Sequence, residues 1–269
     1  MTESNPIISN QSLGKLLGNS LTSTPCVNVR KDAKVKVATG MLVQYLETFT
    51  DSVLVRDGTK PIGVIGGREV IRGVYKNPSS DFFEMQQIDE ICDKRLNVIT
   101  SDTSLNTLIS LWKEVGRAFA VVNMGHDDYS VISVKKLLEI GINNETNFHI
   151  SEIPKKNIIT FEKDATFGDI MKLMLENKTR KILLEGTNQF INDRIIIETI
   201  EKFEYLINTK NFLEIPVNNV VSLEDAKVVS DDLTITDISK IMFEMSHPLI
   251  IHENRVISPW DVCMVLGRI

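Results

Sequence analysis

The 269-residue chain has 42% hydrophobic and 25% charged residues, a composition typical of a folded globular protein. Its formal net charge of −6 argues against a nucleic-acid-binding protein, because such proteins rely on clustered lysines and arginines. No apolar stretch reaches the roughly 18–20 residues that cross a bilayer, and the N-terminus lacks a secretory-signal pattern. The sequence therefore predicts a cytoplasmic protein without a membrane segment.

Three cysteines, Cys26, Cys92 and Cys263, are far apart and lack the C-x-x-C spacing of zinc or redox sites. They predict reduced, structural side chains and no metal centre. The net charge still allows a discrete basic pocket that binds one small anion.

One pattern occurs four times along the chain, and each copy begins with a short β-type run that leads to an aspartate. The runs begin at Val27, Val98, Ile158 and Val228, and the aspartates are Asp32, Asp102, Asp164 and Asp232. These aspartates are 62 to 70 residues apart, so each copy is one supersecondary unit of about that length.

After each aspartate, apolar residues step by three and four, which predicts an amphipathic helix. These helices begin near Val35, Leu105, Phe167 and Ile235. Two β-type runs joined by a turn follow, at 52–66, 118–133, 181–192 and 248–258. A second helix then begins at Arg68, Val134, Asp193 and Pro259.

The predicted fold is therefore α/β, with four tandem β-α-β-β-α repeats at residues 13–78, 79–143, 148–208 and 209–269. The polar, asparagine-rich stretch 141–147 is the predicted linker between the second and third repeats. One unit of this size cannot bury its sheet and both helices alone, so the copies are expected to pair through their apolar faces.

This order of elements resembles the cystathionine-β-synthase (CBS) domain family, from about residue 13 to residue 269. The runs that carry the resemblance are ISEIPKKNIITFEKDATFGDIMKLM in the third copy and VVSDDLTITDISKIMFEMSHPLIIHENRVISPWDVCMVL in the fourth. The resemblance implies two Bateman-like modules, the first copy paired with the second and the third with the fourth. It also implies a regulatory protein that binds adenosine derivatives in clefts between repeats.

In this family, a Ser or Thr at the start of the last helix of a copy faces phosphate, and an Asp three positions later holds the ribose hydroxyls. A helix N-terminus attracts anions, and a carboxylate can accept two hydroxyl hydrogens. The fourth copy matches at Ser258 and Asp261, with Trp260 between them as a candidate to stack on adenine. The same residues also fit an ordinary helix start with a serine N-cap, and sequence alone does not separate the two interpretations.

The other three copies depart from this motif, because the first lacks the hydroxyl and the second and third lack the acid. Their residues at this point are Arg68 and Glu69, then Ser133, Lys135 and Lys136, then Asn192 and Arg194. The cations among them are candidates for phosphate contact, unless they are solvated surface charges. The predicted ligand-binding set is completed by two residues at the start of the third copy's cleft-lining strand and four in the fourth copy: Arg180, Lys181, Val228, Val229, His247 and Pro248.

No serine-hydrolase, metalloprotease or P-loop motif occurs, so the chain is predicted not to be an enzyme and to require no cofactor. The expected regulatory ligand is AMP, ADP, ATP or S-adenosylmethionine, and the signal is expected to reach an unidentified protein partner. Modules of this family stack within one chain or between two, so a homodimer fits as well. The alternative interpretation is an interaction or scaffold protein with degenerate, non-binding pockets.

Overall fold

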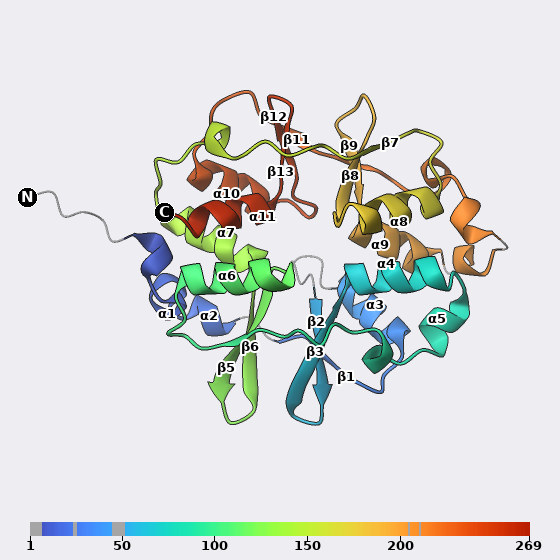
Figure 1. Cartoon of the computed structure of the whole chain (residues 1–269), viewed down its shortest axis with the longest axis horizontal. Coiled ribbons are helices and arrows are strands. Elements are labelled where there is room, and N and C mark those ends of the chain that lie inside the picture. Colours follow the sequence, from blue (N-terminus) through green and yellow to red (C-terminus); the bar gives the residue numbers. More distant parts are fainter. Residues whose placement is uncertain (1–6, 24–25, 45–51, 204, 210) are drawn as a thin grey trace, which may run out of the picture. The chain divides into compact units, whose positions relative to one another are not determined.

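The structure is a computed structural model that describes residues 7–23, 26–44, 52–203, 205–209 and 211–269 (Figure 1). Each repeat has the predicted order of strand, helix, strand, strand and helix, which confirms the α/β fold class. Among the described residues, no helix combines the length and the apolar character needed to cross a membrane.

The four repeats are built from equivalent elements. The first contains β1 (Asn28–Arg30), α3 (Val35–Gln44), β2 (Ser52–Asp57), β3 (Lys60–Gly66) and α4 (Gly67–Lys76). The second contains β4 (Val98–Ile99), α6 (Leu105–Val115), β5 (Phe119–Gly125), β6 (Asp128–Ser133) and α7 (Val134–Asn143). The third contains β7 (Thr160–Phe161), α8 (Phe167–Glu176), β8 (Lys181–Leu184), β9 (Gln189–Asn192) and α9 (Asp193–Lys202). The fourth contains β11 (Lys227–Val228), α10 (Ile235–Phe243), β12 (Ile250–His252), β13 (Arg255–Ile257) and α11 (Pro259–Leu266).

Each repeat forms a small sheet around its middle strand. In the first three repeats, the middle strand is parallel to the first strand and antiparallel to the third. The fourth repeat has the same strand order, and β10 (Glu224–Asp225) extends the sheet of the third repeat beside β9. In the last hairpin, Glu253 and Asn254 have φ of 46° and 63°, as a two-residue turn of type I′ requires at both positions.

The chain divides into two compact units, each of which combines two non-consecutive repeats. Unit 1 comprises residues 1–26, 95–156 and 228–269, with the second and fourth repeats. Unit 2 comprises residues 27–94 and 157–227, with the first and third repeats. Helix α7 packs against α10 and α11 in unit 1, and α4 packs against α8 and α9 in unit 2. These helix contacts supply the burial that one repeat lacks.

Close approach of helices shapes the core of unit 1. A Cβ atom added to Gly141 on α7 would lie 2.3 Å from Ser239 Oγ on α10, so only glycine lets these helices meet at this distance. The predicted linker 141–147 is therefore wrong at its start, because residues 141–143 form the last turn of α7. Gly141 lies in a polar stretch of the sequence, but it is buried and takes part in helix packing.

A short leader segment precedes each repeat and packs on a neighbouring repeat. The leaders contain η1 (Ile8–Asn10) with α1 (Leu13–Leu17) and α2 (Ser20–Ser23), η3 (Ile88–Glu90), η4 (Ile150–Glu152) and η7 (Val217–Asn219). Isolated β-bridges join Ser12 to Ser104, Lys34 to Gln87, His149 to Thr234 and Thr166 to Pro216. The first and second repeats thus exchange leaders, as do the third and fourth.

This exchange explains why each leader lies in a different compact unit from the repeat that follows it in the chain. The predicted repeat boundaries place each leader with the repeat after it, whereas the leader packs in the unit that contains the neighbouring repeat. The pairing of the first repeat with the second and of the third with the fourth stays a prediction. The arrangement of those pairs as modules stays a prediction.

Candidate functional site

The best match to the ligand motif lies at the N-terminus of α11 in unit 1. Ser258 is the N-cap residue, and its backbone N–H and hydroxyl donate to Asp261 Oδ2 at 2.9 and 2.8 Å. Asp261 is only 6% exposed. One carboxylate oxygen is therefore used in a capping box, so the ordinary helix-start interpretation of Ser258 and Asp261 is geometrically correct.

The second oxygen of Asp261 has a different partner, which sequence reasoning missed. Lys156 Nζ donates to Asp261 Oδ1 and forms an ion pair with it. The Lys156 side chain is 55% exposed, whereas that of Asp261 is 6% exposed. The only sequence signal was the pair Lys155-Lys156 at the start of the third copy, and nothing in it identified Asp261 as a partner.

Two further helices begin with the same type of capping box, which gives a standard for comparison. Thr166 and Asp169 open α8, and Thr234 and Asp237 open α10, each with a hydroxyl-to-carboxylate hydrogen bond of 2.7 Å. Hydrogen bonds from the Thr166 hydroxyl and backbone lower the pKa of Asp169. Asp261 differs from these two acids because it is buried and because a lysine, Lys156, bonds to its second carboxylate oxygen.

In the first repeat, the equivalent acid is already held by an arginine. Glu69 Oε2 accepts from the Gly66 backbone N–H at 3.0 Å, and Glu69 Oε1 accepts from Arg68 Nε at 3.1 Å. Arg68 also donates to Asp93 Oδ2 at 2.9 Å. The structure thus directs the predicted phosphate ligand Arg68 toward two carboxylates of its own unit.

In the third repeat, Asn192 caps α9 by accepting from the Ile195 N–H at 2.8 Å. The next residue, Asp193, is 3% exposed and accepts from Arg180 Nε and NH2 at 2.6 and 3.2 Å. A Cβ atom on Gly67 would lie 2.2 Å from Asp193 Oδ2, so this carboxylate lies against the N-terminus of α4. An internal acid therefore occupies the place where that helix could attract an anion.

Arg194 has a structural position in unit 2. Its side chain is buried and donates to the Leu42 carbonyl at 2.8 Å, in the last turn of α3. Its Nε lies 3.5 Å from Glu198 Oε1, and burial raises the pKa of the Glu198 carboxyl. Arg194 thus supports the packing of α9 against α3, because a cation at a helix C-terminus stabilises the exposed carbonyls.

In the second repeat, Ser133 is the buried N-cap residue of α7. Lys135 lies over the Phe243 ring, with Nζ 4.6 Å from the centroid. Lys136 donates to Ser20 Oγ at 2.6 Å and to Glu139 Oε2 at 3.4 Å. These two lysines contact α10 and the first leader, respectively, in addition to their own helix.

The remaining predicted residues lie in or beside the sheets. In the fourth repeat, Val228 is 52% exposed, and the Val229 N–H donates to the Ile251 carbonyl at 3.0 Å. Trp260 is partly buried against the core of unit 1. His247 is half-buried, Pro248 is buried, and Lys181 begins β8 of unit 2. Val228, Val229 and the N-terminus of α11 in the fourth repeat are thus parts of unit 1.

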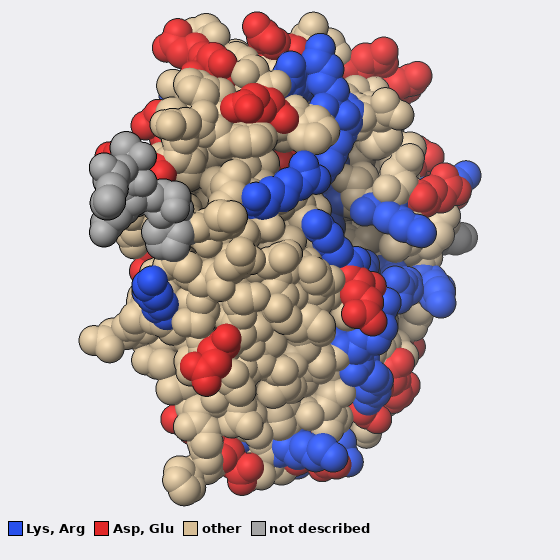
Figure 2. Space-filling model, turned by 60° about the vertical axis from the view of Figure 1, so that its left-hand side comes forward, with Lys and Arg blue, Asp and Glu red and all other residues tan. Residues whose placement is uncertain are grey.

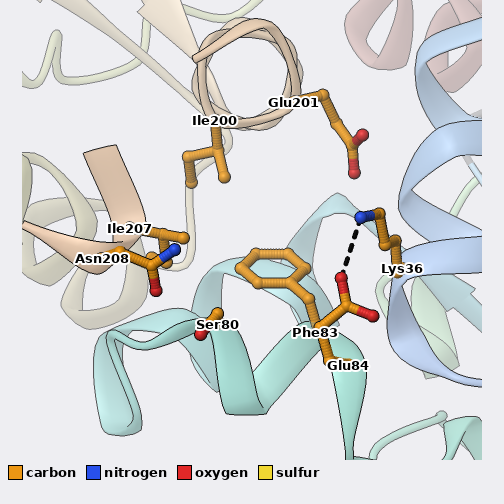
Figure 3. A pocket seen from close by; sticks show the side chains of 8 residues that line it. All are labelled: Lys36, Ser80, Phe83, Glu84, Ile200, Glu201, Ile207 and Asn208. Carbon is orange, nitrogen blue, oxygen red and sulfur yellow. Dashed lines mark hydrogen bonds and ion pairs between the residues drawn. The ribbon is translucent and has the colours of Figure 1, made fainter. Parts of the chain in front are cut away.

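A separate pocket in unit 2 contains none of the predicted ligand residues. Phe83 on α5 (Ser80–Glu84), Ile200 on α9 and Ile207 on η5 (Leu206–Asn208) form its apolar wall, and an ion pair between Lys36 and Glu84 borders it (Figure 3). It encloses about 70 Å³, whereas sites that bury a drug-sized ligand have roughly 300–1,000 Å³. This pocket is too small for a nucleotide.

Charge is unevenly distributed over the surface. On the face of the molecule drawn in Figure 2, lysine and arginine side chains gather in a band along one edge, beside a broad area with few charges. A local basic surface thus coexists with the net charge of −6. In the described part of the chain, no three His, Cys, Asp or Glu side chains gather as metal ligands would.

Comparisons with known proteins agree with this architecture. Residues 150–191 match the family model of the CBS domain. A comparison with curated proteins found no match. Among solved structures, the chain is similar to a Methanocaldococcus jannaschii protein proposed as an archaeal homologue of g-AMPK, with a TM-score of 0.75, 13% identity, and coverage of 94% of this chain and 99% of that one.

A second similar structure is an uncharacterized conserved protein from Pyrococcus horikoshii. Its TM-score is 0.56 with 13% identity, and the alignment covers 91% of this chain and 96% of that one. At 13% identity, these two structural similarities show a shared fold and nothing about function. Residues 150–191 therefore match the CBS domain, and the chain as a whole shares the fold of the Methanocaldococcus jannaschii protein.

Proposed function

We propose that the chain is a cytoplasmic regulatory protein that binds an adenosine derivative, with its principal site at the N-terminus of α11 in the fourth repeat. The CBS-domain fold supports a role in regulatory nucleotide sensing in general. The observation that carries the specific proposal is the buried carboxylate of Asp261, which uses one oxygen for capping and offers the other to Lys156.

The chemistry of this site suits a nucleoside. Ribose hydroxyls can donate to Asp261 Oδ1 while Oδ2 keeps its bonds to Ser258, so binding need not dissolve the helix start. The Ser258 hydroxyl and the positive end of α11 favour a phosphate group nearby. Trp260, Val228 and Val229 supply apolar surface in the same repeat for the base, with His247 and Pro248 in the strand that follows α10.

The other repeats are weaker candidates for binding. Arginines already bind Glu69 and Asp193, and the second repeat has Lys136 where the ribose acid would be. The cations Arg180, Lys181, Lys135 and Arg194 stay proposals as phosphate contacts. We rank these residues as weaker candidates than the α11 site, because Arg180 and Arg194 contribute to packing and Lys135 contacts an aromatic ring.

Signalling would follow from a difference in packing. A ligand shifts a conformational equilibrium only by binding one state more tightly than another. The exchanged leaders provide a route, since a change in one repeat is felt by the segment that its neighbour contributes. An unidentified protein partner, or a second copy of the chain, would read that change.

The alternative is a scaffold protein with non-binding pockets, and it is favoured by the internal ion pairs at Glu69 and Asp193. Thermal unfolding with adenosine, AMP, ADP, ATP, S-adenosylmethionine and GMP separates the two functions. A ligand at about 100 times its Kd adds about 2.7 kcal/mol of stability, which raises Tm by roughly 5–10 °C for a chain of this size. If none of the adenosine ligands raises Tm, the proposed ligand binding is refuted and the scaffold function is the remaining one.

The matched variants are Asp261→Asn and Asp237→Asn, which alter the same capping box in two helices of the fourth repeat. We expect Asp261→Asn to lose the ligand-induced shift and Asp237→Asn to keep it, although both lower the starting Tm. Equal losses would show that the ligand does not contact Asp261. The recovered nucleotide should be unchanged, and its hydrolysis would indicate an enzyme instead.

A further inference from the structure

Lys156 is hydrogen-bonded to Asp261 Oδ1, the carboxylate oxygen that a ribose hydroxyl would need. The capping box uses Oδ2, and the ammonium group of Lys156 bonds to Oδ1. Because a carboxylate that is 6% exposed needs full hydrogen bonding, the lysine satisfies the acid when no ligand is bound. From this geometry we infer that Lys156 is an internal competitor of the ligand, which sets the affinity of the proposed α11 site.

The exposure of the two partners favours displacement of the lysine. Asp261 is held by α11, whereas the Lys156 side chain is 55% exposed and belongs to a segment, 154–159, with neither helix nor strand. A lysine has a flexible four-carbon stem, so its ammonium group can move into water without moving the protein backbone. The ligand hydroxyls then replace the hydrogen bond that Asp261 loses.

The place of Lys156 in the chain gives this displacement a consequence. It is the last residue of unit 1, and Asn157 is the first residue of unit 2. Before Lys156, the Arg255 guanidinium donates hydrogen bonds to the carbonyls of Ser151 and Ile153 and thereby restrains the leader. After Lys156, the Ile159 carbonyl accepts from the Leu183 N–H at 3.1 Å. Lys156 therefore ties the middle of the connecting segment to α11.

Ligand binding at the α11 site and the mobility of the connecting segment 154–159 are thereby linked, because both depend on the bond from Lys156 to Asp261. A ligand whose site is competent only part of the time binds with an apparent affinity reduced by that fraction. Since a partly exposed ion pair contributes modestly, removing the ammonium group should tighten adenosine binding by about two- to five-fold. Adenosine is the suitable probe, because it has the ribose but no phosphate that Lys156 could contact after moving.

The test compares the wild-type chain with Lys156→Met, which keeps the stem and removes the charge, and with Lys156→Arg, which keeps a cation. Lys155→Met is the matched control, because it removes a neighbouring exposed charge that does not bond to Asp261. Calorimetric titration with adenosine should show tighter binding for Lys156→Met alone. Equal affinities, weaker binding by Lys156→Met, or the same gain in Lys155→Met would overturn the inference.

Hydrogen exchange of the amides of residues 155–159 supplies a second readout. Adenosine should speed this exchange in the wild type, whereas Lys156→Met should exchange fast already and change little. Slower exchange on binding would contradict displacement. The inference rests on the proposed function, and the outcomes separate the two: absence of binding by every variant refutes both, whereas equal binding refutes the competitor alone.

Discussion

Helix packing in unit 1 depends on the missing side chain of Gly141, and this can be tested by Gly141→Ala. The new Cβ would lie 2.3 Å from Ser239 Oγ and 3.1 Å from Ser239 Cβ, so α7 and α10 must move apart or Ser239 must change rotamer. Alanine favours a helix by about 1 kcal/mol over glycine, and overpacking costs about 1–3 kcal/mol. The expected net change is a loss of up to about 2 kcal/mol in the free energy of unfolding.

The magnitude is isolated by a double-mutant cycle and a matched control. In the Ser239→Ala background the hydroxyl is gone, so Gly141→Ala should cost about 1–2 kcal/mol less than in the wild type. Gly40→Ala on α3 adds a Cβ with nothing within 4 Å, so it should stabilise by up to about 1 kcal/mol. Urea unfolding followed by circular dichroism measures the wild type and all four variants. Equal stabilisation by Gly40→Ala and Gly141→Ala would refute the packing argument.

Three further predictions concern single contacts. Arg180→Met should lower the free energy of unfolding by about 1–3 kcal/mol, because it leaves the buried Asp193 carboxylate without its two hydrogen bonds; a smaller loss in the Asp193→Asn background, measured by urea unfolding, would confirm the pair. Glu253→Gly should raise stability by about 0.5–1 kcal/mol in the same assay, since glycine adopts a φ of 46° without strain, and a loss would contradict this account of the last hairpin. Hydrogen bonds from the Ser151 backbone and hydroxyl lower the pKa of Asp232. The stability from this contact is therefore present above the pKa of the unfolded state and disappears as pH falls through the lowered pKa of the folded state. Tm measured from about pH 5 to pH 3 should fall less steeply in Ser151→Ala than in the wild type.

Local patterns were sufficient to predict the repeats. Apolar residues such as Leu105, Ile109 and Trp112 follow helical spacing and are buried on α6, as their period requires. The turn at Glu253 and Asn254 was also recognisable, because two β-type runs flank it. These features depend on residues close in the chain, so the sequence alone contains the necessary information.

Relations between distant residues could not be predicted in the same way. The leader exchange joins His149 to Thr234 through backbone atoms, which carry no residue-specific signal. Gly141 looked like part of a polar linker, because the contact that requires glycine is made by Ser239, almost a hundred residues later. The bond from Lys156 to Asp261 spans a similar distance and was missed for the same reason.

The chemistry of the paired cation separates the repeats more clearly than the motif letters do. Arg68 and Arg180 each bond to buried carboxylates through a rigid guanidinium group, and Arg180 does so with two parallel hydrogen bonds. Such pairs are costly to break, since their loss leaves a buried charge. The acid at α11 instead has a lysine, which is compact, flexible and largely in water. A carboxylate that must be both stable when empty and available to a ligand needs a partner that leaves at low cost. Asp261 meets that condition, since Lys156 bonds to one of its oxygens and the capping box uses the other, and we therefore propose the fourth repeat as the binding site.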